Sequence, residues 1–245
     1  MKTIGVVVAK GGTGKSSIAS NLAHALSRYG SSVLVDLDPQ GNASSYLVGD
    51  DIKHELVDVL DESATLVDTL VADSPTFSIL PTKPNSRLKL FGETQLTTQP
   101  FLFQELRDLL RDDFSFEYCV FDMGPGLNTL ERSALLACDE VITPILPESF
   151  SFDGISTFRD ELAKIKKNFR VEIEFTKVAV NRFNRTYGVH KRYLTALQGV
   201  NGYTFYPFPQ DTKLTESQEM RTPILEYAQE SKFAESILNL AEVLQ

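Results

Sequence analysis

Residues 3–17 read TIGVVVAKGGTGKSS, and this stretch decides the fold. Its first part, Thr3–Ala9, is a short apolar run, typical of a strand buried on both faces of a parallel sheet. Three glycines follow, and from Lys15 onward Ile18 and Leu22 stand at helical spacing. A strand, a glycine-rich loop and a helix in this order indicate an α/β protein with a phosphate-binding turn.

The glycine loop, residues 10–17, has the residue types that a nucleotide requires. Glycines let backbone N–H groups wrap a phosphate, and the N-terminus of the following helix adds positive partial charge. Lys15 is expected to reach the β- and γ-phosphates, and the Ser16 hydroxyl to ligate Mg²⁺. The predicted nucleotide-binding residues of the loop are Lys10, Gly11, Gly12, Thr13, Gly14, Lys15, Ser16 and Ser17.

The loop departs from the usual pattern G-x-x-x-x-G-K-[ST] at its first position. That pattern needs a glycine where this chain has Ala9, and a second lysine, Lys10, stands beside it instead. The structural alternative is a glycine turn that only joins a strand to a helix. The Lys-Ser pair at the start of the helix favours the phosphate-binding interpretation.

Further apolar runs alternate with helical patterns along the chain. The predicted strands are Ser32–Leu37, Phe77–Leu80, Tyr118–Phe121, Val141–Leu146 and one or two within Val171–Phe183. The predicted helices are Lys15–Tyr29, Pro100–Leu110, Leu127–Ala137, one with the apolar stripe Phe158, Leu162, Ile165 and Phe169, and Ser231–Leu244. We expect Gly41–Val71 to be a mobile surface insertion or a pair of short helices. The alternation predicts a mostly parallel twisted sheet with helices on both faces, in a single domain over residues 1–245.

Carboxylates follow two of the predicted strands. Residues 36–42 read DLDPQGN, and Asp38 could orient or deprotonate an attacking water, although capping of the turn before Pro39 is the alternative. Tyr118–Asp122 ends in the position at which a Walker B aspartate holds the shell of Mg²⁺. The predicted metal site therefore comprises Ser16, Asp38 and Asp122.

Composition and charge limit the function classes. Apolar residues make up 42% and charged residues 23%, as in globular proteins, and no apolar run has the length of a membrane span. Cys119 and Cys138 lie in apolar runs, which predicts buried free thiols in a reducing cytoplasm. The net charge is −9, but residues 159–221 carry 12 Lys and Arg against 7 Asp and Glu. A local basic face for a phosphate backbone is one interpretation of this segment, and a solvated surface is the other.

Together these motifs resemble the deviant-Walker P-loop ATPases of the ParA/MinD type, over nearly the whole chain. Lys10–Ser17 resembles the signature-lysine loop of that family. Asp122–Gly126 takes the place of its D-T-P-P segment, with Met123 and Gly124 as departures. The other matching segments are Asp36–Asn42, Pro144–Ile155, Phe208–Ser217 and Pro223–Ile237.

The resemblance implies a P-loop NTPase fold, ATP and Mg²⁺ as cofactors, and a homodimer that encloses two ATP molecules. Lys10 would cross to the partner's ATP close to Gly11, and Asp38 would handle the hydrolytic water, so the catalytic residues would be Lys10, Lys15 and Asp38. Asn181 and Pro209 match positions that contact adenine. For Asn181, a turn at the end of a strand is the alternative.

Two branches of that family bind different surfaces. ParA-like members bind DNA without sequence preference, and MinD-like members bind membrane through a basic amphipathic C-terminal helix. Here Ser231–Leu244 carries Lys232 as its only base, so we expect it to pack on the domain and not on a membrane. The predicted DNA-binding residues are Lys213, Lys232 and Arg192.

The resemblance to the ParA-like branch implies a cytoplasmic, nucleoid-associated ATPase. It would position plasmid, chromosome or protein cargo, and a ParB-like partner would stimulate its hydrolysis. The alternatives are a MinD-like membrane-associated ATPase and a nucleotide-switched binding module with negligible turnover.

Overall fold

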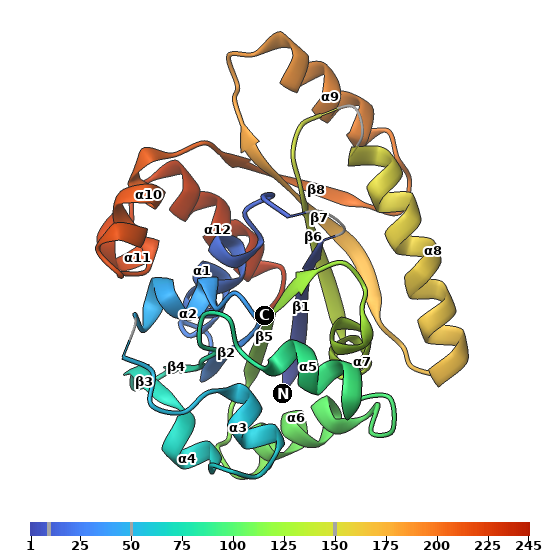
Figure 1. Cartoon of the computed structure of the whole chain (residues 1–245). Helices are drawn as coiled ribbons and strands as arrows, with labels where there is room; N and C mark the ends of the chain where they lie inside the picture. Colours follow the sequence, from blue (N-terminus) through green and yellow to red (C-terminus); the bar gives the residue numbers. More distant parts are fainter. Residues whose placement is uncertain (9–10, 50, 149–150) are drawn as a thin grey trace.

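The computed structural model describes residues 1–8, 11–49, 51–148 and 151–245 (Figure 1), so Lys10 lies outside the described residues. In these ranges the strands form one sheet in the order β3-β4-β2-β5-β1-β6-β7-β8. Neighbouring strands are parallel except for the β3/β4 pair. The strands are β1 (Lys2–Val8), β2 (Ser32–Leu37), β3 (Val71–Ser74), β4 (Phe77–Leu80), β5 (Tyr118–Pro125), β6 (Glu140–Ile145), β7 (Glu174–Phe183) and β8 (Thr204–Pro209).

Helices cover both faces of the sheet. They are α1 (Lys15–Leu26), α2 (Asn42–Leu47), α3 (Leu56–Leu60), α4 (Leu66–Thr69), α5 (Leu88–Thr94), α6 (Leu102–Asp112), α7 (Thr129–Leu136), α8 (Ser151–Phe169), α9 (Gly188–Gln198), α10 (Thr212–Glu219), α11 (Ile224–Tyr227) and α12 (Lys232–Glu242). The cores place α1, α2, α11 and α12 on one face and α3, α5, α6, α7 and α8 on the other. Within the described residues, no helix combines the length and apolarity that a bilayer span requires.

The central strands carry consecutive apolar residues because successive side chains enter opposite cores. In β2, Val33 and Val35 pack in one core and Leu34 in the other. In the C-terminal helix α12, the apolar side chains recur at helical spacing and lie on one face, which packs on the core. Its apolar stripe is fully buried, as predicted: Phe233, Ile237, Leu240 and, just past its end, Leu244.

The predicted parallel sheet with two helical layers is confirmed, and β2 and β4 have the predicted bounds. Val171–Phe183 contains one strand, β7, and Gly41–Val71 forms three short helices, α2, α3 and α4. The prediction for Phe169 was wrong, because its side chain is 39% exposed and stacks edge-on against Phe101 instead of entering the core. The short polar edge strand β3 has no apolar pattern that could have predicted it.

The sheet order brings the glycine loop and the carboxylate-bearing strand ends together. β1 lies next to β5, and β2 is the next strand along. Asp36 of β2 pairs directly with Asp122 of β5. Because parallel strands end at the same edge, the loop after β1 and both carboxylate segments meet there.

Candidate functional site

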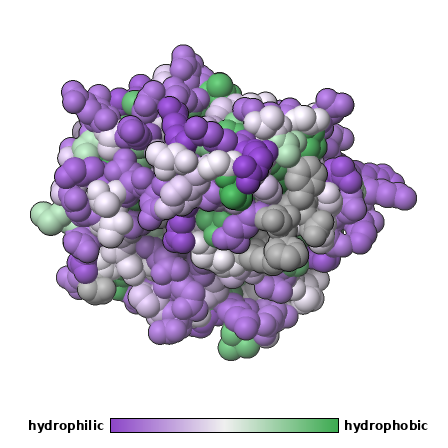
Figure 2. All heavy atoms as spheres, turned by 90° about the horizontal axis from the view of Figure 1, so that it is seen from above, coloured by the Kyte–Doolittle hydropathy of each residue, from purple (hydrophilic) through white to green (hydrophobic). Residues whose placement is uncertain are grey.

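A cavity of about 640 Å³ opens at the carboxyl edge of the sheet. Seen from above in Figure 2, the exposed atoms of this side belong mostly to hydrophilic residues, with apolar residues in small groups. The lining comes from the ends of β1, β5 and β7, the glycine loop with the start of α1, the segment after β2 with α2, and α10. The lining residues are Val8, Gly11, Gly12, Gly14, Lys15, Ser16, Ser17, Asp38, Gln40, Asn42, Ser45, Tyr46, Pro125, Arg182 and Gln218.

Backbone geometry explains why the loop needs glycine. Gly14 has φ +85°, in the left-handed region, and a Cβ there would lie 2.0 Å from Nδ2 of Asn181. That amide nitrogen donates a hydrogen bond to the Thr13 carbonyl at 2.7 Å. Asn181, which we expected at adenine, is thus buried against the loop and holds its backbone in place.

Lys15 lies among carboxylates in the interior. Its Nζ is 2.5 Å from Oδ1 of Asp122 and 3.5 Å from Oδ2 of Asp38, and the residue is only 7% exposed. Burial alone would lower the pKa of Lys15, but Asp122 and Asp38 more than offset this, so the pKa is raised. The amine therefore stays charged and is available to a phosphate.

Asp36 fixes the backbone of Asp38 through a hydrogen bond. Its carboxylate accepts hydrogen bonds from the backbone N–H and the hydroxyl of Ser44, at 2.8 and 2.7 Å, and from the backbone N–H of Asp38 at 3.1 Å. Burial, followed by the nearby Asp122 carboxylate, raises the pKa of Asp36 to about 7. Asp38 itself both caps the turn, by accepting from the Gln40 N–H, and faces Lys15. The two interpretations of Asp38 are therefore compatible.

The oxygen atoms that line the cavity, together with the buried Asp122 behind Lys15, fit a hard divalent cation. Oδ2 of Asp122 is buried and has no hydrogen-bond partner within the described residues. The Lys15 amine is the one described cation that contacts Asp122 and Asp38, so the site has an excess of negative charge. Ser16, Asp38 and Asp122 all offer oxygen, the ligand type that Mg²⁺ prefers.

Arg182 and Gln218 line the cavity although the sequence did not single them out as site residues. Arg182 has φ +53°, and its backbone N–H donates to Oδ1 of Asn181 at 2.9 Å. Gln218 donates to the Ser17 hydroxyl at 2.8 Å. The position of Arg182 beside Asn181 is a usable signal, whereas nothing in the sequence connects Gln218 to a loop 201 residues away.

The other predicted residues lie outside this cavity. Pro209 and Lys232 line a separate hollow of about 320 Å³. Lys213, on α10, donates to Glu216 at 2.8 Å, and its Nζ lies 6.0 Å from the centre of the Tyr227 ring. Arg192 lies on α9 and is exposed. The predicted DNA contacts thus come from three different helices.

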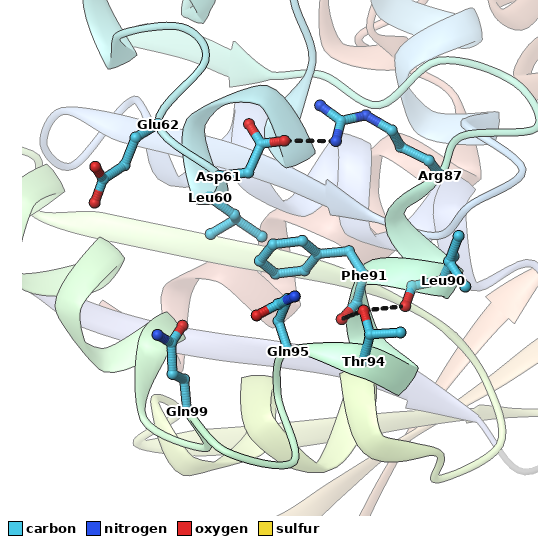
Figure 3. Close-up of a pocket in the computed structure, with 9 residues that line it drawn as sticks. All are labelled: Leu60, Asp61, Glu62, Arg87, Leu90, Phe91, Thr94, Gln95 and Gln99. Atoms are coloured by element: carbon cyan, nitrogen blue, oxygen red, sulfur yellow. Dashed lines mark hydrogen bonds and ion pairs between the residues drawn. The ribbon is translucent and has the colours of Figure 1, made fainter.

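Figure 3 shows another cavity, of about 420 Å³, between the end of α3 and α5. Its basic residue, Arg87, points at Asp61 and donates to it at 2.5 Å, and it also donates to Asp58 at 2.8 Å. Unlike the cavity beside Lys15, it has no glycine among the described residues of its lining and no loop before a helix that could surround a phosphate. The cavity beside Lys15 is therefore the candidate site.

Comparisons with known proteins agree with this geometry. Residues 1–175 match a family model described as "AAA domain". The chain is 30% identical to the cell division protein PomZ of Myxococcus xanthus over 93% of this chain and 73% of PomZ. It is 25% identical to the chromosome partitioning protein ParA of Caulobacter vibrioides over 98% of this chain and 92% of ParA.

A solved structure, the septum site-determining protein MinD of Pyrococcus horikoshii complexed with Mg-ADP, is 27% identical to this chain. The two superpose with a TM-score of 0.78, over 100% of this chain and 96% of MinD. The family match, the two relatives and the shared fold agree with the lysine-bearing loop between β1 and α1. The chain therefore belongs to the ParA/MinD family of P-loop ATPases.

Proposed function

We propose that this protein binds Mg-ATP in the cavity beside Lys15 and hydrolyses it to ADP and phosphate. The observation that carries the proposal is a charged, buried Lys15 beside Asp122, whose second oxygen has no hydrogen-bond partner within the described residues. The Mg-ADP of the Pyrococcus horikoshii MinD is consistent with this choice of ligand.

Each residue would have a distinct task. Lys15 would leave its carboxylate partners and place its charge on the β- and γ-phosphates, while the backbone around Gly12 and Gly14 surrounds them. Ser16 and Asp122 would hold Mg²⁺, which neutralises phosphate charge. Asp38, fixed by Asp36 and facing the same cavity, would position the attacking water and complete the metal shell.

The wider cycle follows from the family. ATP would join two copies of the chain, with Lys10 reaching the partner's nucleotide and Gly11 at the crossing point. The space around Gly11 supports this, because a Cβ added there would meet no described atom within 4 Å. The dimer would bind duplex DNA without sequence preference through Lys213, Lys232 and Arg192. A ParB-like partner would stimulate hydrolysis, and the cargo would be positioned along the nucleoid in the cytoplasm.

The packing of α12 favours this cycle over a MinD-like one. Its apolar stripe faces the core and is not available to a membrane surface. A nucleotide-switched module with negligible turnover is the other candidate, and it differs from an ATPase only in its rate of hydrolysis.

A phosphate-release assay on the full chain, with and without duplex DNA, separates these functions. We expect Mg²⁺-dependent turnover, which DNA or a partner protein increases, and ATP-dependent dimers in light scattering. The variant Asp38→Ala should bind ATP and lose the turnover, whereas the surface variant Asp68→Ala should match wild type. ATP binding without measurable turnover, even with DNA and the partner, would favour the regulatory module. Failure to bind ATP would overturn the whole proposal.

A further inference from the structure

His24, Asp73 and Glu226 come together at the β3 edge of the sheet, and none of them lines the nucleotide cavity. They belong to α1, β3 and α11, three elements on the left of Figure 1. One nitrogen or oxygen atom from each side chain lies within 4.8 Å of the other two. Nε2 of His24 is 3.0 Å from Oε1 of Glu226. An imidazole and two carboxylates from separate elements thus face a common point.

The histidine is fixed, whereas the carboxylates can adjust. His24 is 7% exposed, and its ring packs edge-on against Phe77 with centroids 5.4 Å apart. The Glu226 side chain is 52% exposed. Asp73 is exposed, and its carboxylate makes no hydrogen bond or ion pair with the residues that the structure describes. Within the described residues, neither carboxylate has an ion pair with a lysine or an arginine.

We propose that His24, Asp73 and Glu226 bind one Zn²⁺ ion, with a fourth position open to water. Zinc takes imidazole nitrogen and carboxylate oxygen at about 2.0–2.2 Å, in a tetrahedral arrangement whose ligands lie about 3.3–3.5 Å apart. The three ligand atoms now lie within 4.8 Å of one another, and rotation of the exposed Asp73 side chain would bring its carboxylate to the shorter distance that zinc requires. Mg²⁺ and Ca²⁺ prefer sites made only of oxygen, so the imidazole distinguishes this site from the one beside Lys15.

Zinc here would tie three elements together. The first backbone N–H of α11, that of Ile224, already donates to Asn21 of α1 at 2.8 Å. The metal would add a second tie between α1 and α11 and would attach the edge strand β3 to both. α11 follows α10, which carries Gln218 at the nucleotide cavity. The bound ion would thus stiffen the segment that closes one side of that cavity.

Titration of the full chain with ZnCl₂ by calorimetry, in excess Mg²⁺ so that sites made only of oxygen are occupied, tests the proposal. We expect one Zn²⁺ per chain and a higher melting temperature in its presence. His24→Gln, Asp73→Asn and Glu226→Gln each remove one ligand with little change of shape. Each should weaken Zn²⁺ binding by at least about 10–100-fold, the range seen even for outer-shell partners of a metal.

The matched control is His54→Gln, because Nδ1 of His54 lies 3.9 Å from Asp58 in another imidazole–carboxylate pair. This control should bind Zn²⁺ like wild type. If His24→Gln fails to fold, the two exposed carboxylate variants still decide the question. Absence of Zn²⁺ binding by wild type, or equal binding by Asp73→Asn, Glu226→Gln and wild type, would overturn the proposal. Neither result bears on ATP binding, which is measured without zinc.

Discussion

Lys15 and Lys213 carry the same charge, but one lies in the interior and the other in solvent. Lys15 is 7% exposed and faces Asp122 and Asp38, whereas the side chain of Lys213 is 52% exposed and pairs with Glu216 three residues away. A buried charge is screened little, so its loss affects the fold and the ligand strongly. An exposed charge is screened by salt and acts only together with others. Substitution of the buried Lys15 should therefore have a much larger effect on ATP binding than substitution of the exposed Lys213 has on DNA binding.

The largest effect is expected for Lys15→Ala. It removes the positive charge that the phosphates need and leaves Asp122 without its partner. ATP binding should be lost, and the free energy of unfolding should fall by about 3 kcal/mol, the scale for breaking a buried ion pair. Titration with a fluorescent ATP analogue and thermal unfolding measure the two effects.

Lys89→Ala is the matched control, because Lys89 is exposed on α5. It should leave both properties unchanged. Wild-type affinity in Lys15→Ala, with the fold intact by circular dichroism, would remove Lys15 from the phosphate site.

A smaller effect is expected for Asp38→Ala, because its main task is to position the attacking water, while Lys15, Ser16 and Asp122 still hold Mg-ATP. Hydrolysis should slow by about 10²–10⁴-fold, the usual contribution of general acid–base catalysis, while ATP affinity stays within a few fold. Single-turnover phosphate release measures the rate of the chemical step. A rate equal to that of wild type would assign the water to another residue.

The exposed lysines should act only as a group and only at low salt. Lys213→Glu with Lys232→Glu should weaken ATP-dependent binding to duplex DNA without changing ATP affinity. Losing four phosphate contacts per dimer would flatten the plot of log affinity against log salt by up to about 3.6, at about 0.9 per contact. Mobility shifts at several salt concentrations give this slope.

The control for this pair is Lys53→Glu with Lys89→Glu, which changes the net charge equally at two exposed positions outside the basic segment. It should keep most of the slope. An equal loss of slope in both double variants would mean that DNA binding depends only on the net charge of the protein.

The sequence predicted local features of the fold and the site, but not the contacts between distant segments. The glycine loop, β2 and β5 could be predicted, because local apolar runs and turn residues specify buried parallel strands and the loops at their ends. The clamp from Asn181 to the Thr13 carbonyl and the bond from Gln218 to Ser17 could not, since each joins segments more than 160 residues apart. Phe169 was misplaced because a helical stripe indicates which face is apolar, but not where the helix leaves the core.

The smallest effect is expected for the two cysteines, which should not react with a thiol reagent in the folded chain. Their reactivity tests whether solvent and reagents reach the interior near Lys15. Cys119 lies on β5 three residues before Asp122, and it is fully buried, while Cys138 is 3% exposed. Burial raises the pKa of both thiols. Because only the thiolate reacts, a raised pKa lowers the reactive fraction at any pH below it, and burial also blocks the reagent. A thiol-specific reagent at mildly alkaline pH should therefore label neither cysteine in the folded chain and both after unfolding in guanidinium chloride. Rapid labelling of Cys119 in the native protein would mean that the interior beside β5 opens readily. Water would then reach Lys15 and screen its charge more than its burial implies.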